Sequence, residues 1–320
     1  MSKKIRTIVV GVAAISSQDS HTGPGDADPV LAPAIELAHS LGAALHVVHV
    51  FSLPDPVLAA YGGNSGDAAF HVRYASRLAL HVEGQAAASP RGEAVHCHAL
   101  EGSPGPRLAE FADDVGADLV IVGASRRGRL WHSILGTTAA RVLRAAHVPV
   151  LVLRKPFKQS PARVLLATDL SEENGAAHTR AIETIADTFG REALQLRAVY
   201  VVSYDPMIPP PLPDEVLKEV AAEQLGRFLA EDVRSPLPVE RQVRSGDTSG
   251  EIVRAADEWQ ADLLVMVARG SGAPEGSLGS TTASAIRHAS CNVLVIPPVP
   301  APREPGVAAA QTTVVVQAGA

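Results

Sequence analysis

Several features that would mark a specialised class of protein are scarce in this chain of 320 residues. There are only two cysteines, Cys97 and Cys291, too few for a fold held together by disulfides, and aromatic residues make up 4%. Both cysteines fall in predicted strands, where we expect small buried side chains in a reducing cytosol. Because 46% of residues are hydrophobic, the cores must consist of Val, Leu, Ile and Ala, as in buried parallel sheets.

Net charge and hydropathy argue against two kinds of partner. A net charge of −6 provides no general basic field for nucleic acid, and no apolar run approaches the roughly 20 residues that a membrane-spanning helix needs. Residues Lys3–Ala14 superficially resemble a short signal peptide. Their counterpart Arg163–Thr168 is internal, however, and must be a strand. We therefore predict a first strand at the N-terminus and a cytoplasmic protein without nucleic-acid or membrane partners.

The chain repeats itself after about 144 residues. The recurring pairs are 117–123 with 261–267, 136–139 with 279–282, and 148–152 with 291–295. A period of domain size indicates tandem domains rather than a solenoid, whose units are far shorter. Length alone also favours about two domains.

Domain limits follow from this repeat. We predict one domain over residues 1–157 and a second over 158–298. Residues 299–320 begin with proline and alanine, and we expect a disordered tail because this segment cannot bury enough apolar surface to offset its ordering entropy.

Each repeat alternates buried apolar runs with amphipathic stretches, a pattern typical of βαβ units and a parallel sheet. Strands are predicted near 5–12, 44–50, 93–100, 118–123, 149–153, 163–168, 194–202, 239–244, 262–267 and 293–296. Helices are predicted near 30–41, 71–88, 104–115, 135–146, 172–189, 214–232, 248–259 and 279–289. The fold class is therefore α/β, with two tandem five-stranded parallel sheets flanked by helices.

The loop after the fourth strand of the first repeat has the composition of a phosphate cradle. Parallel sheets of this kind bind ligands outside the carboxyl ends of their strands, where the strand order reverses. Glycines there allow close backbone approach to an anion, and the following helix offers unpaired N–H groups and a partial positive charge. The candidate residues are Gly123, Ser125, Arg126, Arg127, Gly128, Gly136, Thr137 and Thr138.

These motifs resemble the universal stress protein family in its tandem form. Nucleotide-binding members carry Gly, two residues, Gly, nine residues and then Gly-Ser/Thr, with an aspartate just after the first strand. The resemblance covers about 5–153 and 163–297. It implies a five-stranded parallel sheet with four helices, of the Rossmann-like type seen in adenine-nucleotide alpha-hydrolases. It also implies binding of ATP or a related adenine nucleotide, or no ligand and action through dimerisation and partner contacts.

Neither half matches the family's motif completely. In the first repeat Arg126 occupies the position of the middle glycine, and Ala13 stands where the aspartate is expected. In the second repeat Asp169 restores the aspartate, although it fits a helix cap equally well, while Val267 replaces the first glycine and Glu275 would repel phosphate. We therefore assign nucleotide binding to the first domain. Weaker candidates in the second are Asp169, Gly270, Gly272, Gly279 and Ser280.

Histidines of the first repeat suggest a further, weaker site. Strand spacing puts His96 and His98 on one face of the third strand, and the neighbouring second strand carries His46 and His49. Imidazole is a good ligand for zinc. No Glu, Asp or Cys completes the set at a recognisable spacing, however, so histidines at a sheet end are the alternative and no metal is expected.

Two apolar strands, Val150–Leu153 and Val293–Ile296, are predicted to lie at sheet edges. An exposed apolar edge invites aggregation and needs cover. Because the connecting segment 155–161 is short, we predict that the two edges pair and form an internal pseudo-dimer, with a homodimer as a further alternative.

Two hypotheses of function remain. The first is a cytoplasmic stress-response binding and regulatory protein that binds ATP or another adenine nucleotide in domain 1, with at most incidental hydrolysis. The second is a nucleotide-free adaptor that acts through domain pairing and protein partners that the sequence does not identify. A dedicated enzyme is disfavoured because no serine elbow or Walker A loop is visible, and no catalytic residue is assigned.

Overall fold

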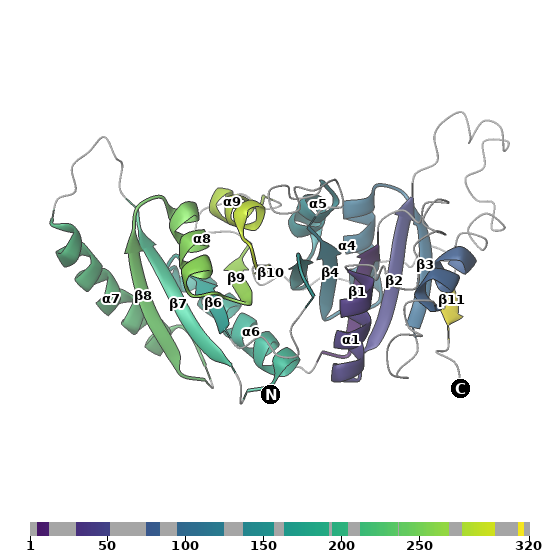
Figure 1. Cartoon of the computed structure of the whole chain (residues 1–320), viewed down its shortest axis with the longest axis horizontal. Coiled ribbons are helices and arrows are strands. Elements are labelled where there is room, and N and C mark those ends of the chain that lie inside the picture. Colours follow the sequence, from purple (N-terminus) through teal and green to yellow (C-terminus); the bar gives the residue numbers. More distant parts are fainter. Residues whose placement is uncertain are drawn as a thin grey trace. The chain divides into compact units, whose positions relative to one another are not determined.

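The computed structural model (Figure 1) comprises two compact units, which we call the N-terminal unit (mainly 5–123 and 137–148) and the C-terminal unit (mainly 149–301). The structure describes residues 5–12, 30–51, 75–83, 95–124, 137–156, 163–191, 194–203, 212–235, 237–268, 277–297 and 313–316. No helix within these ranges is long and apolar enough to cross a membrane.

The sheet of the N-terminal unit runs in the order β11-β3-β2-β1-β4. Its strands are β1 (Thr7–Val12), β2 (Ala44–Phe51), β3 (Val95–Glu101), β4 (Leu119–Gly123) and β11 (Thr313–Val316). Its helices are α1 (Leu31–Leu41), α4 (Pro104–Asp114) and α5 (Thr137–Ala145), and residues 75–83 are also helical. Neighbouring strands from β3 to β4 are parallel, whereas β11 is antiparallel to β3.

The sheet of the C-terminal unit runs in the order β5-β10-β9-β6-β7-β8. Its strands are β5 (Val150–Leu153), β6 (Arg163–Ala167), β7 (Gln195–Val202), β8 (Val239–Ser245), β9 (Leu263–Val267) and β10 (Asn292–Ile296). Its helices are α6 (Glu172–Phe189), α7 (Asp214–Glu231), α8 (Thr248–Glu258) and α9 (Ser280–His288). Neighbouring strands are parallel except for β5 and β10.

Local sequence explains where several of these elements begin and end. The central residues of β1, Ile8–Val10, are fully buried and β-branched, as a two-sided strand requires. α1 ends at Gly42, whose φ of 61° suits glycine. Asp247 precedes α8 and its carboxylate accepts a hydrogen bond from Gly250 N at 2.7 Å, which caps the helix.

These observations confirm the predicted α/β class with parallel sheets flanked by helices. The predicted pairing of the two apolar strands is confirmed as well, since Val152 lies opposite Val293 and Val150 opposite Val295 in an antiparallel ladder. Both cysteines are buried as expected. Burial raises the pKa of the Cys97 thiol to about 12 and that of Cys291 to about 11, so both are protonated and poorly reactive.

The segment 299–320, predicted to be a disordered tail, contains a strand. Residues Thr313–Val316 form β11 and pair with His98–Val95 of β3. Three consecutive valines have high β propensity, and their pairing covers the edge of β3.

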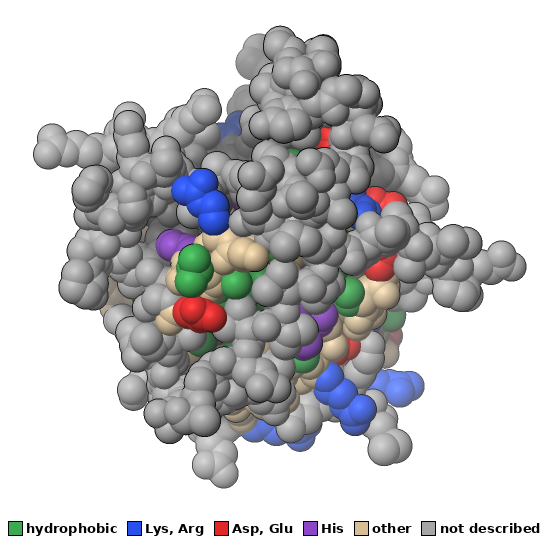
Figure 2. All heavy atoms as spheres, turned by 90° about the vertical axis from the view of Figure 1, so that its right-hand side faces the viewer, with side chains coloured by type: hydrophobic (Ala, Val, Ile, Leu, Met, Phe, Trp, Pro, Cys, Tyr) green, Lys and Arg blue, Asp and Glu red, His purple; other side chains and the backbone are tan. Residues whose placement is uncertain are grey.

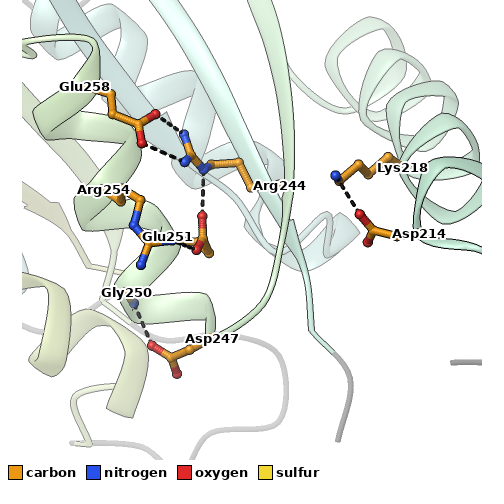
Figure 3. Close-up of polar contacts among 8 residues, drawn as sticks. All are labelled: Asp214, Lys218, Arg244, Asp247, Gly250, Glu251, Arg254 and Glu258. Atoms are coloured by element: carbon orange, nitrogen blue, oxygen red, sulfur yellow. Dashed lines mark hydrogen bonds and ion pairs between the residues drawn. The ribbon is translucent and has the colours of Figure 1, made fainter. Parts of the chain in front are cut away.

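An ion-pair network joins β8 to α8 (Figure 3). Arg244 pairs with Glu251 and Glu258, each at 2.8 Å, and Glu251 also pairs with Arg254. Arg241, three residues earlier on β8, instead lies against α7, since a Cβ at Gly226 would collide with its guanidinium. Because successive strand side chains point to opposite faces, α7 and α8 cover the two faces of β8.

Candidate functional site

Each unit has one point where the strand order reverses. In the N-terminal unit, β2 and β3 lie on one side of β1 and β4 on the other. In the C-terminal unit, β7 and β8 lie on one side of β6, and β9 and β10 on the other. Because β1 is parallel to β4 and β6 is parallel to β9, the loops that follow each pair leave the same edge of the sheet. Ligands of doubly wound sheets bind at such positions.

In the N-terminal unit, Gly123 ends β4 at this edge and has a packing reason to be glycine. A Cβ on Gly123 would lie 2.7 Å from Cγ2 of Val30, closer than non-bonded carbon atoms approach. Val30 is buried just before α1. The bare backbone of Gly123 therefore lets the start of α1 approach the end of β4, whatever else binds there.

α5 begins at Thr137, as the sequence predicts for the helix after the cradle loop. Its first turn contains no acidic residue and its last turn contains Arg144, so nothing acidic on the helix offsets the positive end of its dipole. The side chain of Thr138 is exposed. The other candidates of this loop, Ser125, Arg126, Arg127, Gly128 and Gly136, lie outside the described residues.

In the C-terminal unit, Asp169 follows β6 and forms a local hydrogen-bond network. Its Oδ1 accepts hydrogen bonds from Ser171 N at 3.1 Å and Ser171 Oγ at 2.8 Å. The side-chain amide of Asn174 lies 3.3 Å from both carboxylate oxygens. Leu170 between them has a φ of 59°, which is unusual for a branched residue. Asp169 thus shapes the turn into α6, although Ser171 is the formal N-cap.

The start of α9 is tied to the end of β9. Gly279 N donates a hydrogen bond to Ala268 O at 2.9 Å, and Thr282 Oγ1 donates one to Val267 O at 3.0 Å. The N-terminus of α9 therefore lies at the carboxyl end of the sheet, where Ser280 is exposed and the first turn has no acidic residue. Val267, which replaces the first glycine, is buried. Gly270 and Gly272 lie outside the described residues.

His178 of α6, which belongs to no recognisable sequence motif, also lies at this edge. The ring is buried, with Nδ1 2.7 Å from Asn174 O and Nε2 3.3 Å from Ala167 O. Burial lowers the pKa of His178, and the two carbonyl contacts oppose that shift. The only sequence signal was the i, i+4 spacing of Asn174 and His178. His178 anchors α6 to the end of β6.

The histidines predicted to share one face of β2 and β3 do so, but as a stack. The ring of His46 stacks on those of His96 and His98 at centroid distances of 4.8 and 5.1 Å, and its Nδ1 lies 3.0 Å from His98 Nε2. His49 points to the opposite face, where its ring contacts Val12 O at 3.2 Å. Across the described ranges, no group of three His, Cys, Asp or Glu residues is arranged to hold a metal ion.

Burial keeps His46 and His98 uncharged near neutral pH. It lowers the pKa of His46 to about 4, with a smaller contribution from the charge of His96. It lowers the pKa of His98 to about 3, with smaller contributions from the charges of His46 and then His96. On the face shown in Figure 2, the described histidine, acidic and basic side chains are scattered and do not form a patch of one charge sign.

Comparisons with known proteins match both halves of the chain to one family. Residues 4–154 and 162–297 each match the model of the universal stress protein family. The universal stress protein MJ0531 of Methanocaldococcus jannaschii is 41% identical over 68 residues, which cover 21% of this chain and 40% of that protein. The universal stress protein Rv2623 of Mycobacterium tuberculosis is 28% identical over 231 residues, which cover 68% of this chain and 74% of that protein.

Solved structures agree in fold. A universal stress protein from Archaeoglobus fulgidus aligns with a TM-score of 0.57 over 90% of this chain and 98% of that chain. A protein of unknown function from Pseudomonas aeruginosa, PA1789, aligns with a TM-score of 0.61 over 92% and 93%. Both are 18% identical to this chain, so the likeness concerns the fold alone.

Proposed function

Because the chain belongs to the universal stress protein family, we propose that it is a stress-response binding protein whose N-terminal unit holds ATP or a related adenine nucleotide. The observation that carries this proposal is the reversal of strand order at β1 and β4. At that edge β4 ends at Gly123, and the next helix begins at Thr137 without an acidic residue in its first turn. This arrangement suits a bound phosphate.

Residues of the cradle have distinct roles in the proposal. The N–H groups at the start of α5 face the phosphates, and the hydroxyls of Thr137 and Thr138 add hydrogen bonds. Arg126 and Arg127 supply positive charge beside them. Ser125, Gly128 and Gly136 allow the backbone to follow the phosphate chain. The phosphates of ATP carry the negative charge that this loop would recognise. We assign no metal ligand and no catalytic residue.

The C-terminal unit takes no triphosphate in this proposal. Asp169 accepts local hydrogen bonds from Ser171 and Asn174, so its carboxylate already has partners. Val267 is buried, and Glu275 of the following loop repels phosphate. Gly279 and Ser280 then only begin α9.

Calorimetric titration of the whole chain with ATP tests the assignment, with one matched pair of variants. Thr137→Ala and Ser280→Ala each remove a hydroxyl from the first residue of equivalent helices, α5 and α9. We expect one ATP per chain and about 2- to 12-fold weaker binding for Thr137→Ala, the worth of one neutral hydrogen bond. Ser280→Ala should bind like the unchanged protein. The reverse result would place the nucleotide in the C-terminal unit.

The second candidate function is a nucleotide-free adaptor that acts through pairing of its halves and through protein partners. One observation favours it, namely that Gly123 and Asp169 both have structural reasons for their identity. Absence of ATP binding by the folded chain would support the adaptor. In either case we propose a cytoplasmic protein with domains 1–157 and 158–298, arranged as an internal pseudo-dimer.

A further inference from the structure

A pocket of about 810 Å³ opens in the C-terminal unit. It is lined by the end of α6, the second half of α7, the segment 233–237 and the start of β8. Residues 233–237 lead into β8 at Val239, so the pocket lies at the amino end of that strand. Within the same unit, Asp169 and the start of α9 lie at the carboxyl ends of the strands, so the pocket is separate from that edge of the sheet.

Positive charge dominates the lining of the pocket. Arg191, Arg234 and Arg241 contribute to it, and Glu183 is the only acidic residue among the described residues that line it. In the part of the chain that the structure describes, no ion pair involves any of these three arginines. Arg197 on the neighbouring strand, by contrast, pairs with Glu240 at 2.6 Å. The pocket thus holds guanidinium groups that lack a carboxylate partner among the described residues.

Gly226 of α7 allows one of these arginines to lie at the pocket wall. A glycine in a helix interior destabilises the helix relative to alanine. A Cβ at this position would collide with Nη1 of Arg241. The bare backbone therefore makes room for the guanidinium beside α7, where Gly226 and Arg241 both line the pocket.

Apart from Glu183 and Ser235, the remaining wall is apolar, and it includes Leu229, Val233, Leu237 and Val239. The volume falls within the range of small-molecule sites, about 300–1,000 Å³. A hydrocarbon alone would leave the arginines unpaired, and an inorganic anion alone would not contact the leucine and valine side chains. A guanidinium fork pairs with a carboxylate through two parallel hydrogen bonds.

We propose that this pocket, which Arg191, Arg234 and Arg241 line together with apolar side chains, binds a small organic carboxylate with a hydrocarbon body. This inference does not depend on nucleotide binding. It gives the protein a second ligand site, in the unit that takes no triphosphate.

Calorimetric titrations of the whole chain with three probes test the requirement for a carboxylate and the requirement for a hydrocarbon separately. Octanoate has both the carboxylate and the hydrocarbon, octan-1-ol lacks the charge, and inorganic phosphate lacks the hydrocarbon. We expect octanoate to bind with one site per chain and the other two to bind at least about tenfold more weakly. Equal binding of octan-1-ol would overturn the role of the arginines, and equal binding of phosphate would overturn the role of the apolar wall.

Variants then locate the site. Arg241→Gln and Arg234→Gln should each weaken octanoate binding about tenfold, as expected for loss of one charge-assisted contact at an exposed position. Arg227→Gln is the matched control, because Arg227 is exposed on α7 beside Gly226 and does not line the pocket. Octanoate affinity equal to that of the unchanged chain in both pocket variants would refute the site.

Gly226→Ala provides a test that loss of folding cannot mimic. The added methyl group must displace the Arg241 guanidinium, so octanoate binding should weaken several-fold. Urea unfolding should show no loss of stability, because alanine favours the helix. Unchanged octanoate affinity in this variant would contradict the proposed placement of Arg241. ATP affinity should stay constant throughout, which separates this proposal from the nucleotide assignment.

Discussion

Replacing Asp169 with alanine separates a structural role of this carboxylate from a role in nucleotide binding. Asp169 Oδ1 accepts two hydrogen bonds from Ser171, at 3.1 and 2.8 Å, and both oxygens contact the Asn174 amide. Leu170 between them has a φ of 59°, a left-handed conformation that costs a non-glycine residue roughly 1–2 kcal/mol. The carboxylate therefore holds a strained turn between β6 and α6.

The expected loss of stability follows from the exposure of these groups. Asp169 is exposed, so water molecules replace some of the hydrogen bonds that Asp169→Ala removes. We therefore expect the free energy of unfolding to fall by about 0.5–2 kcal/mol, the usual effect of removing a helix-capping side chain. With a urea slope of about 1–3 kcal/mol per M, the unfolding midpoint should fall by about 0.2–2 M. ATP affinity should not change, because we place the nucleotide in the other unit.

Urea unfolding followed by circular dichroism, with ATP titration of the same samples, measures both quantities. Ser171→Ala is the companion variant, because it removes the hydroxyl that Asp169 accepts. A double-mutant cycle should give a coupling of at least about 0.5 kcal/mol between the two residues. Loss of ATP binding in Asp169→Ala with an unchanged unfolding midpoint would refute this reasoning and assign the nucleotide to the C-terminal unit.

Three further outcomes are expected. Ala13→Asp, which supplies the aspartate missing after β1, should strengthen ATP binding by about 1–2 kcal/mol in calorimetry. An unchanged affinity would show that the cradle loop of the first domain does not bind ATP. Arg126→Gly should weaken ATP binding by removing a cation, whereas tighter binding would show that the side chain obstructs the cradle. The half-buried His46 and the buried His98 have pKa values of about 4 and 3, against about 6.5 when unfolded. The unfolded chain therefore takes up more protons below pH 6.5, and stability should fall as the pH drops from 6.5 toward 4. His98→Gln should reduce the difference in urea midpoint between pH 7 and pH 4.5, and an equal difference would contradict the assignment.

Most elements of the fold were predictable because buried parallel strands have a strong local signature. Val164–Leu166 and Leu263–Val265 are continuous apolar runs that are fully buried on both faces of their sheet. Such runs need no knowledge of their partners to be recognised. The repeat added a second, independent copy of each signal. The pairing of β5 with β10 also followed, because two apolar edges require cover.

β11 was not predictable in the same way. Thr313–Val316 spans four residues in a segment rich in alanine and proline, and its partner β3 lies more than 200 residues earlier. Pairing over such a separation leaves no local pattern. The contact between Gly123 and Val30 likewise depends on how α1 packs, which periodicity does not reveal.

A candidate site could be proposed from the sequence only where one short segment carries it. The cradle loop and its helix form one continuous stretch, so their composition pointed to phosphate. The arginine-lined pocket draws Arg191, Arg234 and Arg241 from three separate segments, and no spacing joins them. A glycine within a helix, Gly226, was the single local sign. For Asp169 the sequence left capping and ligand binding open, and its hydrogen bonds with Ser171 account for the first.

The antiparallel ladder between β5 and β10 affects how the chain must fold during synthesis. β5 ends at Leu153, whereas β10 begins at Asn292, about 140 residues later. At 5–20 residues per second, a ribosome needs roughly 7–28 s to produce that interval. During that time the valine-rich edge of β5 has no β10 to pair with. It can instead pair with the β5 edge of a neighbouring nascent chain. Slow or crowded translation should therefore favour pairing between chains over pairing within one.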